Sequence, residues 1–115
     1  MRSLPEHVNI REVGLRDGLQ IEDPVPTQAK IRLLEALVAT GVPRIELTAF
    51  VSPRAVPAMA DADRMAAAAQ ALSADTFAAD GRRERPSPEF SALVASPNGA
   101  RRAVGPDQIV DALPI

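Results

Sequence analysis

The 115-residue sequence contains no cysteine and a single histidine. Without cysteine the chain can form neither a disulfide framework nor a thiolate metal site. The one histidine, His7, precedes the first segment with a strand-like pattern. We therefore expect His7 to be a solvated residue near the chain terminus and not a metal ligand.

A strong excess of charge of one sign is also missing, since 13 Lys and Arg residues and 15 Asp and Glu residues leave a net charge of −2. Nucleic acids and anionic membranes attract basic surfaces, so neither is an expected partner. No apolar run approaches the roughly 18 residues of a membrane-spanning helix. Residues 1–7 are polar and lead into no apolar segment of the secretory type, which predicts a cytoplasmic protein.

Three segments have the residue pattern of β-strands. They alternate apolar and polar residues or gather β-branched and apolar ones. These segments are Val8–Val13, Arg44–Val51 and Phe90–Ala95. The stretch from Leu15 to Pro26 carries Gly18 and two prolines, and residues 80–88 are charged and contain proline. We interpret both as loops.

Helices are expected between these strands. The first is Gln28–Thr40, with Thr27 as its N-cap, and Gly41 and Pro43 end it. One apolar stripe at helical spacing predicts its buried face: Ile31, Leu34, Leu37 and Val38. A second helix is expected over the Ala-rich residues 64–72, because alanine has the highest helix propensity.

The alternation of strands and helices is typical of parallel βαβ units in an α/β fold. Such units wind right-handed, so we predict that strands 8–13 and 44–51 are adjacent and parallel. A TIM (β/α)₈ barrel takes about 250 residues, and this chain supplies about three βα units. Residues 1–115 are thus expected to form an incomplete TIM barrel or a small open sheet. Residues 101–104 suggest a short helix and 107–113 the start of a fourth unit, while 105–115 stay unassigned.

The motif Gly14-Leu15-Arg16-Asp17-Gly18-Leu19-Gln20 lies where the first strand gives way to its loop. Arg16 offers a forked cation that can hold a carboxylate or an enolate oxygen. Asp17 offers an oxygen ligand suited to Mg²⁺ or Mn²⁺. The same residues could equally form a surface Arg–Asp turn between two glycines.

The second strand contains Glu46 at a position where a parallel sheet is covered on both faces. Strand alternation predicts that Ile45 and Leu47 point one way and that Glu46 and Thr48 point the other. A buried Glu46 needs a partner, and Arg16 is the expected one. We therefore expect Arg16, Asp17 and Glu46 to cluster at one end of the sheet, in a structural ion pair, a catalytic site or both.

Two long motifs resemble one known family. Residues Val8–Glu22 (V-N-I-R-E-V-G-L-R-D-G-L-Q-I-E) resemble the opening signature of 3-hydroxy-3-methylglutaryl-CoA lyases, E-V-G-P-R-D-G-L-Q-N-E. Residues Arg44–Met59 (R-I-E-L-T-A-F-V-S-P-R-A-V-P-A-M) resemble their second-strand segment, I-E-x-T-S-F-V-S-P-K-W-V-P-Q-M. Residues Ala92–Gly99 resemble the third-strand end, L-V-P-N-x-x-G.

The resemblance implies a retro-Claisen cleavage of 3-hydroxy-3-methylglutaryl-CoA to acetyl-CoA and acetoacetate, with a divalent cation, Mg²⁺ or Mn²⁺. Asp17 matches a metal ligand of the family. Arg16 and Glu46 match catalytic residues, and Arg16 matches the arginine that stabilises the enolate of acetyl-CoA. The positions expected near the acyl-CoA substrate are Glu12, Gln20, Thr48 and Asn98.

The sequence also departs from the family pattern. Ala49 replaces a serine, and Leu15, Ile21 and Ala55 replace a proline, an asparagine and a tryptophan. The family's His-x-His metal ligands and loop cysteine have no counterpart in this chain. We therefore expect a truncated lyase whose isolated chain is inactive and forms homo-oligomers. A related isopropylmalate or homocitrate synthase and a non-catalytic, partner-dependent remnant are the alternatives.

Overall fold

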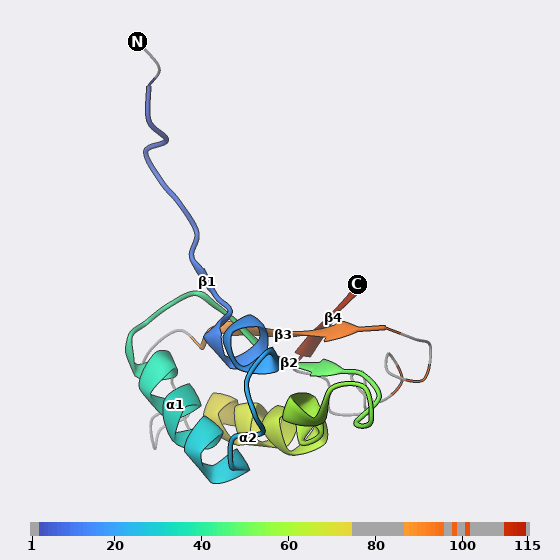
Figure 1. The fold of residues 1–115 in the computed structure, drawn as a ribbon. Helices are drawn as coiled ribbons and strands as arrows, with labels where there is room; N and C mark the ends of the chain where they lie inside the picture. The colour runs from blue at the N-terminus through green and yellow to red at the C-terminus, as the bar shows by residue number, and fades with distance from the viewer. Residues whose placement is uncertain (1–2, 75–86, 96–97, 99–100, 102–109, 115) are drawn as a thin grey trace.

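The computed structural model describes residues 3–74, 87–95, 98, 101 and 110–114. Its elements alternate as expected, with two single helical turns added (Figure 1). In chain order they are β1 (Arg11–Glu12), the π-helical turn η1 (Gly14–Gly18), α1 (Thr27–Ala39), β2 (Arg44–Phe50), the 3₁₀ turn η2 (Pro57–Met59), α2 (Ala62–Ala74), β3 (Glu89–Val94) and β4 (Val110–Pro114).

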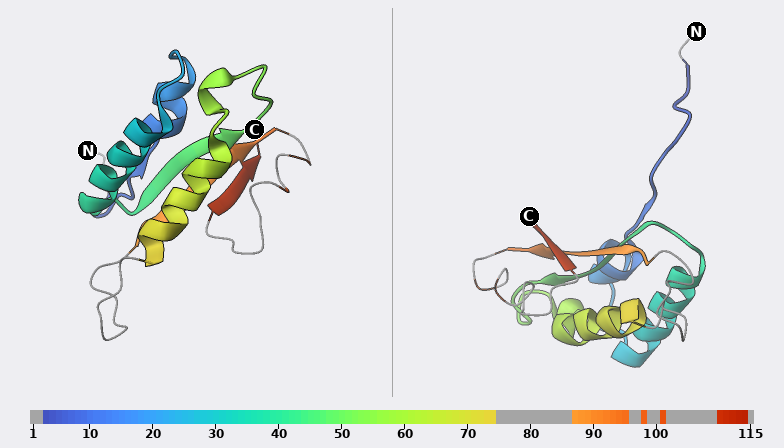
Figure 2. Two further views of the ribbon diagram at one scale, coloured as in Figure 1. Left: turned by 90° about the horizontal axis from the view of Figure 1, so that it is seen from below. Right: turned by 180° about the vertical axis from the view of Figure 1, so that it is seen from behind.

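All four strands belong to one parallel sheet in the order β1-β2-β3-β4. The predicted parallel neighbourhood of the first two strands is confirmed, since Arg11 pairs with Arg44 and Glu12 with Ile45. Helices α1 and α2 lie side by side against one face of the sheet (Figure 2). This arrangement of sequential parallel strands with helices on one side is that of an incomplete (β/α)₈ barrel.

The first strand is shorter than its sequence pattern predicts. Only Arg11 and Glu12 pair with β2, whereas the expected strand began at Val8. The preceding residues extend away from the sheet (Figure 1), and the side chains of Val8 and Ile10 are exposed. The alternating pattern is present, but among the described residues no neighbouring strand pairs with residues 8–10.

The main core lies between the sheet and the two helices. From α1 it takes Leu34 and Val38, while Ile31 and Leu37 pack at its edge. From α2 it takes Ala62, Met65 and Ala69. The sheet and η1 supply the remaining buried residues: Leu15, Ile45, Leu47, Phe50, Phe90 and Ala92. The predicted stripe of the first helix is therefore confirmed as the face that packs on the sheet.

The ends of α1 differ in how well the sequence predicts them. Thr27 is the first helical residue and not the N-cap, which is Pro26. The Thr27 hydroxyl bonds Asp61 instead of a backbone N–H, so the predicted cap is wrong. Gly41 adopts φ +80° after the helix, a conformation that favours glycine.

Part of the expected loop 15–26 is helical, because η1 follows β1 directly.

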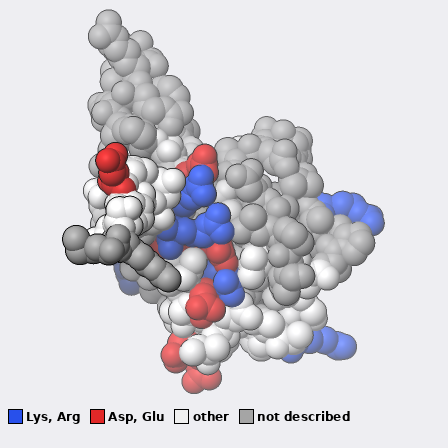
Figure 3. Space-filling model, turned by 90° about the horizontal axis from the view of Figure 1, so that it is seen from above, with Lys and Arg blue, Asp and Glu red and all other residues white. Residues whose placement is uncertain are grey.

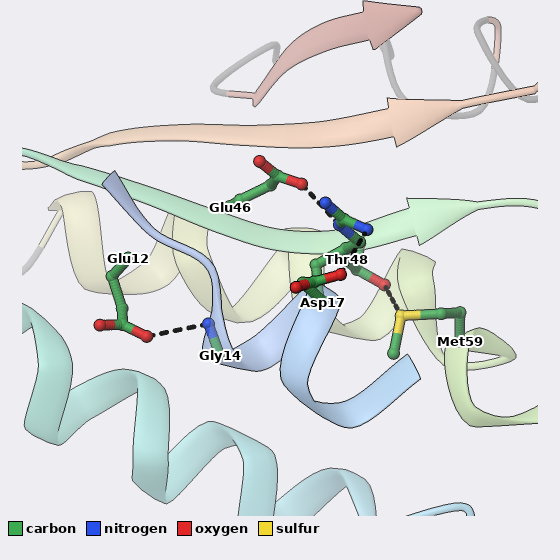
Figure 4. Close-up of polar contacts among 7 residues, drawn as sticks. Glu12, Gly14, Asp17, Glu46, Thr48 and Met59 are labelled. Carbon is green, nitrogen blue, oxygen red and sulfur yellow. Dashed lines mark hydrogen bonds and ion pairs between the residues drawn. The ribbon is translucent and has the colours of Figure 1, made fainter. Parts of the chain in front are cut away.

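A β-bulge interrupts β2. The register with β3 shifts between Glu46 and Thr48, since Glu46 pairs with Ser91 and Thr48 with Ala92. The extra residue breaks the simple alternation of faces. The Glu46 side chain projects from the face of the sheet opposite the helices, whereas the Thr48 side chain points toward Met59 (Figure 4). The prediction that these two side chains point the same way is therefore wrong.

A fourth parallel strand, β4, pairs with β3 along Val110–Pro114. This strand lies where residues 107–113 suggested the start of a fourth unit. Of the expected loop 80–88, residues 80–86 lie outside the described part of the chain. In the expected short helix 101–104, Arg101 is helical and 102–104 also lie outside it. Within the described residues no helix is long and apolar enough to cross a membrane.

Candidate active site

A single helical turn places the Arg-Asp pair at the end of β1. The backbone N–H groups of Arg16, Asp17 and Gly18 all point at the carbonyl oxygen of Val13, at 3.2, 2.7 and 3.3 Å. Leu15 is fully buried in the main core and anchors the turn from below. With this anchor in place, the side chains of Arg16 and Asp17 are presented toward the neighbouring strand β2.

Gly14 makes the entry into this turn possible. Its N–H donates to Oε1 of Glu12 at 2.8 Å (Figure 4). A Cβ atom on residue 14 would lie 2.8 Å from the same oxygen, so any larger residue would displace the carboxylate. Glu12 is therefore used to hold the strand-to-turn junction, and it does not join the Arg16 cluster.

The centre of the candidate site is an ion pair between η1 and β2. Nε of Arg16 donates to Oε1 of Glu46 at 2.5 Å, across 30 residues of sequence. The Glu46 side chain is only 5% exposed and that of Arg16 18% exposed. The partner predicted for Glu46 is thus confirmed, and the pairing satisfies a carboxylate that would otherwise be buried without compensation.

Asp17 completes the cluster from the solvent side. Its Oδ1 lies 3.4 Å from Nη1 of Arg16, and its side chain is 69% exposed. The predicted clustering of Arg16, Asp17 and Glu46 at one sheet end is therefore confirmed (Figure 4). Arg16 has five N–H donors, and these contacts use its Nε and Nη1 atoms, so donors remain that can face an anionic oxygen.

The charges of the three side chains sum to one negative charge, since two carboxylates surround one guanidinium. Such a cluster can attract a cation at Asp17 while Arg16 still offers N–H groups to an anion. Acidic and basic side chains also lie next to one another elsewhere on the face opposite the helices (Figure 3). The geometry thus allows an ion and an anionic oxygen to be held within a few ångströms of one another.

The described residues do not make a complete metal site. No group of three or more His, Asp or Glu side chains within them is arranged to hold an ion. Asp17 is an accessible oxygen ligand, but one carboxylate does not fix Mg²⁺ in its near-octahedral shell.

The other residues expected near a substrate are not among the polar partners of this cluster in the described part of the chain. Thr48 is buried, and its hydroxyl donates to Sδ of Met59 at 3.5 Å. Gln20 follows η1 by two residues, and its Oε1 atom is buried and accepts no hydrogen bond from the described residues. Asn98 is exposed and helical, and residues on both sides of it lie outside the described part.

A second buried ionic cluster has no counterpart in the sequence-based prediction. Nζ of Lys30, on α1, donates to Oδ1 of Asp61 at 2.8 Å and to the Ala58 carbonyl oxygen at 2.6 Å. The Thr27 hydroxyl bonds Oδ2 of Asp61 at 2.6 Å. Lys30 is the only lysine of the chain and shares the helix face of Leu34 and Val38, and that helical spacing is the signal that could have revealed it.

Opposing effects act on the Asp61 carboxyl. Burial alone would raise its pKa. The hydrogen bonds from Lys30 and Thr27, together with the Lys30 charge, outweigh burial and bring the pKa below its ordinary value of 3.8. Asp61 is therefore held as a carboxylate between the starts of the two helices.

Known proteins match both the sequence and the fold. A 3-hydroxy-3-isohexenylglutaryl-CoA/hydroxymethylglutaryl-CoA lyase from Pseudomonas aeruginosa is 41% identical over 103 residues, which is 89% of this chain. The mitochondrial hydroxymethylglutaryl-CoA lyase of Gallus gallus is 58% identical over 60 residues, or 51% of this chain. The chain belongs to the hydroxymethylglutaryl-CoA lyase family. No protein-family model matches the sequence.

Solved structures of the lyase family agree with this assignment. A hydroxymethylglutaryl-CoA lyase from Pseudomonas aeruginosa superposes with a TM-score of 0.66 at 39% identity and covers 84% of this chain. One from Acenitobacter baumannii, in complex with coenzyme A and 3-methylmalate, has a TM-score of 0.67 at 34% identity and covers 90%. The matched region is 28% and 30% of those two chains.

The chain spans less than a third of its lyase relatives. It covers 30% of the Pseudomonas aeruginosa enzyme and 20% of the Gallus gallus enzyme. The four parallel strands and the helices α1 and α2 of the described residues thus correspond to part of the family's barrel. The relatives named here are lyases and not synthases. This favours the lyase interpretation over an isopropylmalate or homocitrate synthase.

Proposed function

We propose that the Arg16–Asp17–Glu46 cluster is one corner of the active site of a carbon–carbon lyase that cleaves 3-hydroxy-3-methylglutaryl-CoA to acetyl-CoA and acetoacetate. The observation that carries the proposal is the buried Glu46 carboxylate, which fixes the Arg16 guanidinium at the end of the sheet. Preorganised charge of this kind stabilises charge that develops in a transition state. Family membership supports the reaction, and the geometry supports the roles proposed for Arg16 and Glu46.

Arg16 has the chemistry that the cleavage requires. Loss of the hydroxyl proton and breakage of the carbon–carbon bond leave negative charge on a thioester enolate oxygen. In the proposal, N–H groups of Arg16 that are not used by Glu46 donate to that oxygen. Glu46 keeps the guanidinium plane from rotating, so little reorganisation is needed when the charge appears.

Asp17 is proposed as one oxygen ligand of a divalent cation, Mg²⁺ or Mn²⁺. Its carboxylate is exposed and lies next to Arg16, and hard cations prefer such oxygens. The other ligands would come from outside the described residues. A cation bound in the complete site would polarise the substrate's hydroxyl oxygen.

The substrate is proposed to be an acyl-CoA of the 3-hydroxy-3-alkylglutaryl class. The complex of the Acenitobacter baumannii lyase with coenzyme A supports a CoA ester. The Pseudomonas aeruginosa relative is named for both a methyl and an isohexenyl substrate. Ala49, in place of the family's serine, removes a hydroxyl near the strand end, so the 3-alkyl group is the part of the substrate to vary in an assay.

The test is a chimeric Pseudomonas aeruginosa lyase in which this chain replaces the segment that it matches. We expect the chimera to release acetoacetate from 3-hydroxy-3-methylglutaryl-CoA with added Mg²⁺. Asp17→Ala in the chimera should abolish release, whereas Asp23→Ala, which removes an exposed carboxylate of the same connection, should leave it unchanged. A folded chimera without turnover, or equal effects of the two substitutions, would contradict the proposal.

The isolated 115-residue chain is expected to be inactive in the same assay. Asp17 alone cannot fix the cation, and the described residues offer no complete metal site. We also propose that the chain forms homo-oligomers, because unpaired strand edges and bare apolar faces favour association. A monomer in sedimentation velocity at micromolar concentration, or acetoacetate release by the chain alone, would refute these points.

A cytoplasmic location is part of the proposal. It is supported by a cytoplasmic lyase of Mus musculus that is 59% identical over 59 residues. Mitochondrial lyases match at a similar level, so fractionation of the source cells is the deciding measurement.

A further inference from the structure

We propose that Lys30 is a positioning residue of the candidate site: its buried ammonium group holds the β2–α2 connection so that Met59 seats against Thr48, next to the strand position of Glu46. This inference rests on the proposed function, in which the end of β2 is part of the active site. The structure supplies three connected contacts, which run from α1 through the connection to β2.

The first contact is the Lys30 side chain itself. It is only 3% exposed, although it carries a charge, and lysine is rarely buried without a partner. Its Nζ bonds the Ala58 carbonyl oxygen and Asp61 Oδ1, on both sides of Met59. One ammonium group thus binds the chain just before and just after this methionine.

The second and third contacts place Met59 on the strand. Met59 is 1% exposed and packs in a small cluster with Ala49 of β2 and with Ala58. Its sulfur accepts the Thr48 hydroxyl at 3.5 Å (Figure 4). The methionine therefore covers the part of β2 that follows the bulge, on the side away from Glu46.

The bulge explains why this position requires external support. A bulge leaves one residue of β2 without a partner on β3, so the ladder is weakened between Glu46 and Thr48. Met59 packs against the strand just beyond that weak point. Lys30 acts on the site through Ala58 and Met59, and it contacts neither Arg16 nor Glu46.

The chain offers a matched pair of methionines for the test. Met59 and Met65 are both 1% exposed, but Met65 belongs to α2 and the main core. Trypsin separates them into the peptides 55–64 and 65–82, because Arg54, Arg64 and Arg82 flank these segments. Mild hydrogen peroxide followed by mass spectrometry gives the oxidation rate of each methionine in one sample.

In Lys30→Met we expect Met59 oxidation to rise about tenfold or more relative to Met65, since a hydrogen bond to a charged group holds the connection closed. Asp61→Asn keeps an acceptor for Lys30 and leaves its bond to Ala58, so the Met59 to Met65 ratio should stay close to that of the parent chain. Equal acceleration of both methionines in Lys30→Met, or an equal rise of the ratio in both variants, would overturn the proposal.

If Lys30→Met does not fold, the reciprocal measurement decides. Lys30 is the only lysine, so an amine-directed acetylating reagent reports on this side chain alone besides the chain's amino terminus. Met59→Ala should raise acetylation of Lys30 several-fold, whereas Leu33→Ala, at a partly exposed position of the same helix, should not. Unchanged labelling in Met59→Ala would refute the coupling. Neither readout involves catalysis, so failure of the lyase proposal, seen in the chimera, is distinguishable from failure of this one.

Discussion

The Arg16–Glu46 ion pair makes an asymmetric prediction about stability. Arg16→Met leaves the nearly buried Glu46 carboxylate without its cation, whereas Glu46→Gln keeps an oxygen that can accept the Arg16 Nε–H bond. Loss of one partner of a buried pair costs about 3–5 kcal/mol, and the partial exposure of Arg16 reduces this to about 2–3 kcal/mol. Glu46→Gln should cost only about 1 kcal/mol, because a neutral hydrogen bond replaces a charged one.

Urea unfolding followed by far-UV circular dichroism measures these free energies, since the chain has neither tryptophan nor tyrosine for fluorescence. The matched control is the pair between Arg44 and Glu89, with 43% and 67% exposed side chains at 3.2 Å. Arg44→Met should change stability by no more than about 0.5 kcal/mol. The double variant Arg16→Met/Glu46→Leu should be less destabilised than the sum of its single variants.

Two results would refute this reasoning. One is a similar loss of stability in Arg16→Met and Arg44→Met, which would mean that the Glu46 site is effectively solvated. The other is simple additivity in the Arg16 and Glu46 cycle, which would mean that the two side chains do not interact in the folded chain.

Further predictions concern acid stability and three glycines. The pKa of Asp61 in the folded chain lies below 3.8, so its stabilising contribution is present above that value and is lost as the pH falls through the folded pKa. The urea midpoint should therefore fall in acid, and Asp61→Asn should flatten this dependence. Gly41→Ala should cost about 1 kcal/mol, because φ is +80° there. Gly14→Ala should also cost about 1 kcal/mol through loss of the Glu12 bond, and co-substitution of Glu12→Ala should add little. Gly18→Ala, where a Cβ meets nothing within 4 Å, is the control for both and should stay within about 0.5 kcal/mol of the parent in thermal unfolding.

The sequence predicts the order of strands and helices and the heart of the candidate site. Parallel strands that follow a right-handed crossover bring their carboxyl ends together, so the pairing of Arg16 with Glu46 is predictable from the sequence. The apolar stripe of α1 was equally predictable, because helical spacing decides which residues face the sheet.

Other features depend on tertiary contacts that local patterns encode only in part. Helical spacing places Lys30 on the buried face of α1, but its partner Asp61 lies 31 positions away, in a segment with no pattern that indicates the pairing. The β2 bulge depends on the register with β3, so strict alternation placed Thr48 on the wrong side. Strand β1 is short because, among the described residues, no strand lies beside residues 8–10 to pair with them, whatever their pattern.

The alanines of α2 have a consequence for how this chain can evolve. Ala62 and Ala69 are completely buried, as is Ala92 of β3 in the same core, while Ala67 of the same helix is exposed. At the buried positions a single added methylene must push a helix away from its sheet, and at the exposed position it meets only water. Alanines of one helix are therefore under different selection: substitutions at the buried positions are selected against, whereas those at the exposed position are tolerated. Among descendants of this sequence, drift should accumulate at Ala67 and leave Ala62 and Ala69 unchanged, although the letters are the same.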